Sequence, residues 1–134
     1  MREYFVDAWY TIALIDRGDQ HHHNAVRLAA RLRDAIFVTH EAVFTEVLAF
    51  FAAVGPHSRS KAVTAVRNGL AQWTVVAFNR DLFARALALY AARPDKEYSL
   101  TDCMSMVVMR DRGIEHVLTN DHHFRQEGFE VLSE

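Results

Sequence analysis

Hydrophobic and polar positions along the chain follow two different periodicities. Short runs rich in β-branched and aromatic residues predict strands, and apolar residues three or four positions apart predict helices. The expected strands cover residues 3–7, 35–39, 72–77, 114–119 and 129–132. The expected helices cover residues 8–15, 20–33, 41–53, 58–71, 80–92, 99–113 and 121–126. Because strands and helices alternate, the sequence predicts an α/β fold, with a mostly parallel central sheet in a three-layer α/β/α arrangement and one domain over residues 1–134.

Residues with known preferences for helix ends set the predicted boundaries. Ser58 is expected to cap the fourth helix, and Ser99 with Asp102 three residues later has the pattern of a capping box. Gly113 suits the position just after a helix. The pair Gly55–Pro56 is expected to stop the helix over residues 41–53.

Composition is that of an ordinary globular domain. Hydrophobic residues make up 51% of the 134 residues, which is enough apolar material for a core. The single cysteine, Cys103, cannot form an internal disulfide, and its apolar neighbours favour a buried side chain. No apolar run reaches the roughly 18 residues of a membrane helix, and the first residues lack the pattern of a signal peptide. We therefore expect a cytoplasmic protein without membrane contact.

The charge balance narrows the classes of partner. A formal net charge of −2 argues against a protein that coats nucleic acid nonspecifically, because such proteins are usually basic. The same charge is compatible with an enzyme that contacts phosphates through a metal ion.

Four carboxylates stand in segments that are otherwise apolar, and they are the candidate functional residues. They are Asp7, Glu46, Asp102 and Asp121. Asp7 and Asp121 lie at the ends of predicted strands, Asp102 lies in the first turn of its predicted helix, and Glu46 lies about a turn and a half into its own. An unpaired carboxylate near a core is costly unless something compensates its charge. Four such residues indicate a shared cation.

Topology brings these carboxylates toward one place. Helices of an α/β sheet run antiparallel to the strands, so helix N-termini lie at the carboxyl edge of the sheet. All four acids can reach that edge, which is where open α/β sheets place their sites. Oxygen ligands of this kind suit Mg²⁺ or Mn²⁺ rather than zinc.

Each carboxylate taken alone also has a simpler interpretation. Asp7, Asp102 and Asp121 could cap helices, because a negative charge is favourable at a helix N-terminus. Glu46 could pair with an arginine. The hypothesis of a metal site depends on the four residues together.

The segments around these acids resemble, in order, the motifs of the PIN domains, and especially of the VapC-type toxins of toxin–antitoxin pairs. The matching segments are Phe5-Val6-Asp7, Thr45-Glu46-Val47-Leu48, Ser99-Leu100-Thr101-Asp102 and Leu118-Thr119-Asn120-Asp121-His122-His123-Phe124. One departure follows the first acid, where family members often carry a serine or threonine and this chain has Ala8. Thr119 and Asn120, beside the last acid, are candidate auxiliary residues.

The resemblance implies a metal-dependent endoribonuclease that is the toxin of such a pair. Its cofactor would be Mg²⁺ or Mn²⁺, bound by Asp7, Glu46 and Asp102, with Asp121 binding a second ion or orienting a ligand through water. Its substrate would be RNA, and its protein partner an antitoxin that covers the acidic edge.

Two other α/β functions require residues that this chain lacks. A HAD-type phosphatase needs Asp-x-Asp after the first strand, where this chain has Asp7-Ala8-Trp9. A receiver domain needs paired acids there and a lysine after its last strand, and both are absent. A non-catalytic PIN-like module that binds metal or RNA, and a DNA-acting or structure-specific nuclease of the same fold, remain as alternatives.

None of the histidines is expected to bind the metal ion. Consecutive helix residues point in different directions, so the run His21–His23 is expected to form a solvated face. For His122 and His123 a loop-and-cap role is favoured over contact with substrate, and His40 is given no role.

The helix over residues 41–53 is expected to be buried on more than one side. Phe44, Phe50 and Phe51 place apolar surface around it, and such helices are buried on both sides. We therefore expect this helix to contribute to a homodimer interface or to a groove for an antitoxin segment.

Overall fold

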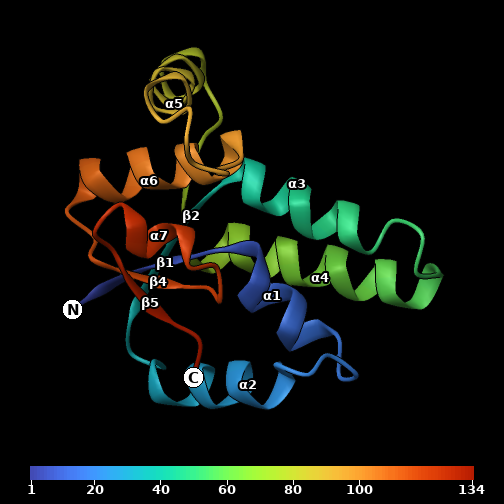
Figure 1. Ribbon diagram of the computed structural model, residues 1–134. Helices are drawn as coiled ribbons and strands as arrows, with labels where there is room; N and C mark the ends of the chain where they lie inside the picture. Colours follow the sequence, from blue (N-terminus) through green and yellow to red (C-terminus); the bar gives the residue numbers. More distant parts are fainter.

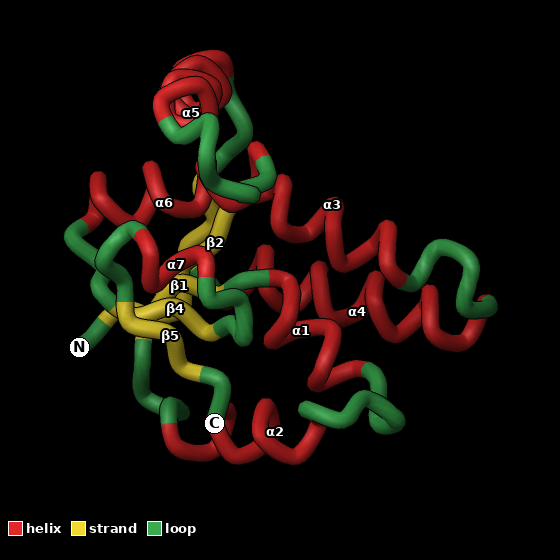
Figure 2. The backbone as a smooth tube through the Cα atoms, viewed as in Figure 1, coloured by secondary structure: helices red, strands yellow, loops and turns green.

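A five-stranded parallel sheet forms the centre of the computed structural model, which describes residues 1–134 (Figures 1 and 2). The strands are β1 (Glu3–Val6), β2 (Ile36–His40), β3 (Thr74–Val76), β4 (His116–Leu118) and β5 (Glu130–Leu132). Their order is β3-β2-β1-β4-β5, and every neighbouring pair is parallel. The prediction of a mostly parallel sheet is confirmed. The chain leaves β1 in one direction and later returns to its other side, so β1 marks the switch point of the sheet.

Seven helices surround the sheet. They are α1 (Ala8–Ile15), α2 (His22–Arg31), α3 (Glu41–Phe50), α4 (Pro56–Gln72), α5 (Arg80–Ala92), α6 (Leu100–Arg112) and α7 (His123–Gln126). Helix α2 lies below the sheet in the view of Figure 1, whereas α6 lies above it with α5 stacked on its outer side. The expected α/β/α layering is confirmed. None of the helices combines the length and the apolar character needed to cross a membrane.

Side chains of β1 alternate between the two faces of the sheet, as in any strand. Phe5 packs in the larger apolar cluster, which contains Val38 and much of α3 and α6. Tyr4 and Val6 pack in a smaller cluster with Leu28 of α2. Both faces of β1 are therefore buried, which explains why this strand is almost continuously apolar.

Cys103 is fully buried on α6, as the sequence predicts. Burial raises the pKa of its thiol to about 11. The side chain therefore stays protonated at neutral pH and contributes to packing.

Several helix boundaries differ from the prediction. Helix α4 begins at Pro56 rather than after Ser58, with Gly55 at the N-cap in a conformation of φ 129°. Proline suits the first helical position because its φ is already helical and its missing N–H is not needed there. Helix α3 ends at Phe50 rather than at residue 53, because residues 51–54 form turns. Helix α7 begins at His123 rather than at residue 121.

Within this chain α3 is buried along one stripe only, and the expected cover by a second copy or an antitoxin segment stays a prediction. Phe44 and Phe51 are buried in the larger cluster. Leu48 and Phe50, which flank the buried stripe on its two sides, are 37% and 50% exposed. The apolar pattern therefore extends beyond the stripe that packs on the core, and its margins are open to solvent.

Candidate metal centre

Asp7 comes directly after β1 and is the N-cap of α1. Its Oδ1 accepts the backbone N–H of Ala8 at 2.9 Å, and its Oδ2 accepts a hydrogen bond from the hydroxyl of Thr119 at 2.7 Å. The Thr119 hydroxyl also accepts the backbone N–H of Asp121 at 3.1 Å. Because β1 and β4 are neighbours in the sheet, Thr119 links the first and last acids of the candidate site.

Asp102 is held at the start of α6 by the predicted capping box. Its Oδ2 accepts the backbone N–H of Ser99 at 3.1 Å, and Ser99 Oγ accepts the backbone N–H of Asp102 at 3.0 Å. These two bonds satisfy donors that the first turn of a helix leaves free. They also fix the direction of the Asp102 carboxylate.

Asp121 lies in the loop between β4 and α7. Its Oδ1 accepts the backbone N–H of His123 at 2.9 Å, which closes a turn that delays the start of α7. Glu46 lies on α3, and its exposed side chain makes no hydrogen bond. Three of the carboxylates are therefore held by backbone groups, whereas that of Glu46 is not.

Charge repulsion links the four carboxylates, although of these only Asp102 and Asp121 belong to a group whose potential ligand atoms lie within 4.8 Å of one another. Burial raises the pKa of Asp7 to about 6, and the charges of Asp102 and Asp121 raise it further. The protein around Glu46 raises its pKa to about 7 although the side chain keeps contact with solvent, and Asp7, Asp102 and Asp121 all add to this. Burial, together with Asp121, also raises the pKa of Asp102. Mutual repulsion of this kind is relieved by a cation.

No lysine or arginine supplies that cation. The lysine and arginines that form ion pairs bind other acids, and they are Arg85, Arg93, Lys96, Arg110 and Arg112. The simpler interpretation of Glu46, an ion pair with an arginine, is therefore wrong. The donor set of carboxylate oxygens without a protein cation fits a divalent metal ion.

His123 joins the site, which the sequence analysis missed. Asp102, Asp121 and His123 each place a potential ligand atom within 4.8 Å of the other two. The expected loop-and-cap role is confirmed for the backbone N–H of His123, which closes the turn, while its ring lies beside Asp102 and Asp121. The sequence signal that could have indicated it is its position two residues after Asp121.

His40 is a second residue that the sequence analysis missed. It is fully buried at the N-cap of α3, and its Nε2 lies 2.9 Å from the hydroxyl of Ser105 on α6. Because Ser105 donates to the carbonyl oxygen of Thr101, its oxygen accepts the proton on His40 Nε2. Burial lowers the pKa of His40 to about 4, so the ring is neutral. His40 thus joins the helix that carries Glu46 to the helix that carries Asp102.

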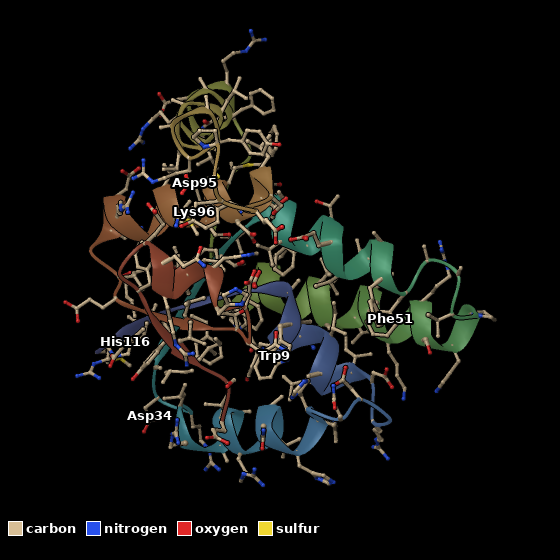
Figure 3. All side chains as sticks on the ribbon, in the orientation of Figure 1. Trp9, Asp34, Phe51, Asp95, Lys96 and His116 are labelled. Atoms are coloured by element: carbon tan, nitrogen blue, oxygen red, sulfur yellow. The ribbon has the colours of Figure 1, made fainter.

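The remaining candidates lie beside the site. Asn120 is exposed, and its Nδ2 is 3.4 Å from Nε2 of His21. The ring of His21 is 5.7 Å from that of Trp9, which lies near the start of α1 (Figure 3). His22 Nδ1 is 2.7 Å from the carbonyl oxygen of Ala13. The expectation of a solvated face is wrong for His21 and His22, because both pack against α1 or the loop after β4.

Comparison with known proteins identifies relatives over nearly the whole chain. Residues 4–130 match the PIN domain. The 23S rRNA-specific endonuclease VapC20 of Mycobacterium tuberculosis is 30% identical over 128 residues, which cover 93% of this chain and 94% of that protein.

Solved structures give the same result. The crystal structure of M. tuberculosis VapC20, described as a sarcin-ricin loop cleaving toxin, has a TM-score of 0.83 at 28% identity and covers 94% of this chain and 95% of that chain. VapBC2 of Rickettsia felis, bound to a DNA fragment from its promoter, has a TM-score of 0.67 at 11% identity, with 96% of each chain covered. PAE2754 of Pyrobaculum aerophilum has a TM-score of 0.62 at 15% identity, covering 98% of this chain and 90% of that one. The last two support the fold alone.

Proposed function

This chain belongs to the PIN-domain family, and we propose that it is a metal-dependent endoribonuclease, the toxin of a toxin–antitoxin pair. One observation carries the proposal: the charges of Asp7, Asp102 and Asp121 all raise the pKa of Glu46, and no lysine or arginine pairs with any of these acids. The likeness to an rRNA endonuclease over 93% of the chain supports hydrolysis of RNA as the reaction.

The ion that fits this site is Mg²⁺ or Mn²⁺. We assign Asp7, Glu46 and Asp102 to direct ligation, and Asp121 to a second ion or to a contact through water. When bound, the ion supplies positive charge that stabilises the scissile phosphate and lowers the pKa of a nearby water molecule.

The residues of the chain itself prepare this chemistry. Thr119 and the backbone N–H of Ala8 hold the Asp7 carboxylate, and Ser99 holds that of Asp102. Preorganised ligands of this kind lose little entropy when the ion and the phosphate bind. The Glu46 side chain lacks such bonds, so the ion itself would be its partner at the site.

The first experiment is cleavage of 23S rRNA, of its isolated sarcin-ricin loop and of unstructured RNA, with Mg²⁺, Mn²⁺ or EDTA. Wild type is compared with Asp7→Asn and Asp102→Asn. Asp34→Asn is the matched control, because Asp34 is exposed just before β2, at the opposite edge of the sheet (Figure 3). We expect metal-dependent cleavage that the first two variants lose by at least about a hundredfold and the control retains.

Other outcomes would contradict the proposal in distinct ways. Binding of metal without cleavage of any RNA would indicate a non-catalytic PIN-like module. Cleavage of DNA but not RNA would indicate a nuclease of the same fold with another substrate. Cleavage that persists in EDTA would place the chemistry outside the four carboxylates.

The proposal includes two protein contacts, an antitoxin and a second copy of the chain. Leu48 and Phe50 on α3, together with Phe78, Phe83 and Leu87 in or beside α5, leave large apolar side chains in solvent. Exposed apolar groups of this kind are typical of protein interfaces. Size-exclusion chromatography with light scattering tests the homodimer, and a monomer at micromolar concentration would contradict it.

A further inference from the structure

We propose that His123, together with Asp102 and Asp121, is a direct ligand of the second ion to which Asp121 was assigned, and makes this site prefer Mn²⁺ to Mg²⁺. The inference rests on the proposed metal-dependent function. It adds a nitrogen ligand to a set that otherwise consists of carboxylate oxygens.

The position of the His123 ring carries the proposal. A ring nitrogen and oxygens of Asp102 and Asp121 all lie within 4.8 Å of one another. Ligands on opposite sides of an ion of this kind are separated by about 4.3 Å, so small side-chain rotations bring the three atoms onto one ion. Nδ1 of His123 is 3.0 Å from Oδ1 of Asp121.

The same nitrogen has no other partner. His123 Nδ1 is buried and makes no hydrogen bond, although it lies close to the Asp121 carboxylate. The Asp121 oxygen it approaches already accepts the backbone N–H of His123. Buried polar atoms without a partner are uncommon and call for an explanation. A metal ion between the three side chains provides one.

Neighbouring residues hold the ring in this place. The Tyr98 ring packs against it with centroids 5.6 Å apart, and the Tyr98 hydroxyl donates to Glu127 at 3.0 Å. Glu127 also accepts hydrogen bonds from Arg93 and Arg110. The ring of His123 is therefore fixed by a network that spans the loop before α6, α6 itself and the end of α7.

The chemistry of the ligands predicts the preference. Both ions bind carboxylate oxygens, but Mg²⁺ takes oxygen almost exclusively, whereas Mn²⁺, the first member of the transition-metal series whose later members favour imidazole, also accepts a nitrogen ligand. Removing His123 should therefore weaken binding of Mn²⁺ and leave binding of Mg²⁺ nearly unchanged. A residue that only supports the fold would affect both ions alike.

The test measures binding of the metal and does not depend on RNA cleavage. Calorimetry gives the affinities for Mn²⁺ and Mg²⁺, and electron spin-echo spectroscopy of the Mn²⁺ complex detects a directly bound nitrogen. The variants are His123→Asn and, as a matched control, His122→Asn, because His122 is the exposed neighbour. His123→Asp replaces the nitrogen ligand with oxygen, and circular dichroism checks the folding of each variant.

We expect wild type and His122→Asn to bind Mn²⁺ with a nitrogen signal, and His123→Asn to lose that signal and about tenfold or more in Mn²⁺ affinity. His123→Asp should shift the preference toward Mg²⁺. Persistence of the nitrogen signal in folded His123→Asn or His123→Asp, or equal weakening of both ions, would overturn the inference and leave the proposed function standing. Failure of wild type to bind either ion would overturn both.

Discussion

At the residue scale, helix capping and metal binding do not exclude each other in this protein. Asp7, Asp102 and Asp121 each accept a backbone N–H, as the simpler interpretation of the sequence expects. A carboxylate has two oxygens and about four lone pairs, so one bond to the backbone leaves acceptor capacity for an ion. The bonds to the backbone also aim the carboxylates, which makes capping part of the construction of the site.

Replacing Thr119 with valine tests this coupling. The change keeps the shape but removes the hydroxyl that donates to Asp7 and accepts from Asp121. We expect the free energy of unfolding to fall by about 1–3 kcal/mol, because buried partners are left unpaired. Since that hydrogen bond lowers the pKa of Asp7, we also expect Mn²⁺ binding to require a higher pH.

The measurements are urea denaturation and calorimetry over a pH series, with Thr11→Val as control. Thr11 is also buried on α1 but makes no hydrogen bond to these carboxylates. An unchanged pH dependence of metal binding in Thr119→Val would contradict the role assigned to its hydroxyl.

At the element scale, the acids of α3 and α6 depend on a contact between the ends of those helices. His40 precedes α3 and Ser105 lies on α6, and their side chains meet in the core. The partners are 65 residues apart in the sequence. This buried hydrogen bond keeps the start of α6, with Asp102, beside the start of α3.

Replacing Ser105 with alanine should show how much this contact contributes. The change leaves the proton on His40 Nε2 without an acceptor in a fully buried position. We expect a loss of about 1–3 kcal/mol in the free energy of unfolding, together with weaker metal binding. Ser60→Ala on the exposed side of α4 is the control. Equal stability of Ser105→Ala and wild type in urea would show that the hydrogen bond does not hold the helices together.

At the scale of the whole molecule, the uncompensated carboxylates act against the stability of the metal-free protein. The pKa of Asp7 rises from 3.8 to about 6 on folding. The folded state therefore keeps this proton to higher pH than the unfolded state does. Stability from Asp7 is fully present below about pH 4 and is lost as the pH rises through about 6.

Asp7→Asn should accordingly stabilise the metal-free protein at neutral pH. The shift corresponds to about 3 kcal/mol, and the weakened bond to Thr119 reduces the expected gain to about 1–3 kcal/mol. The gain should be small near about pH 4 and reach its full size above about pH 6. Urea denaturation of both proteins in EDTA over this range measures it.

Because wild type and Asp7→Asn are compared at each pH, the effect of His40 on the free energy of unfolding cancels. Burial lowers the pKa of His40 to about 4, so its protonation destabilises both proteins equally as the pH falls below about 6.5. Added Mn²⁺ should stabilise wild type by about 2.7 kcal/mol at a hundred times its Kd, and Asp7→Asn much less. If the gain in the free energy of unfolding from Asp7→Asn does not grow with pH, ionisation of Asp7 does not destabilise the folded protein, which would contradict the prediction.

Much of the fold follows from local sequence. Residues 3–7 and 114–119 are short and apolar, whereas residues 80–92 have helical spacing, and these periodicities hold whatever surrounds them. Alternation of the two periodicities implies a parallel sheet, and a parallel sheet implies that residues after strands and at the starts of helices meet at one edge. The placement of Asp7 and Asp102 at that edge follows from the same rule.

The tertiary structure decided the rest. Three features depend on residues far apart in the chain. They are the order of the strands in the sheet, the hydrogen bond between His40 and Ser105, and the position of the His123 ring beside Asp102. No local periodicity encodes such contacts, because they form only when separate elements pack together. The sequence by itself determined the elements and the edge where the acids meet. Packing alone determined their electrostatic coupling, the lack of a protein cation among them and the histidine that joins them.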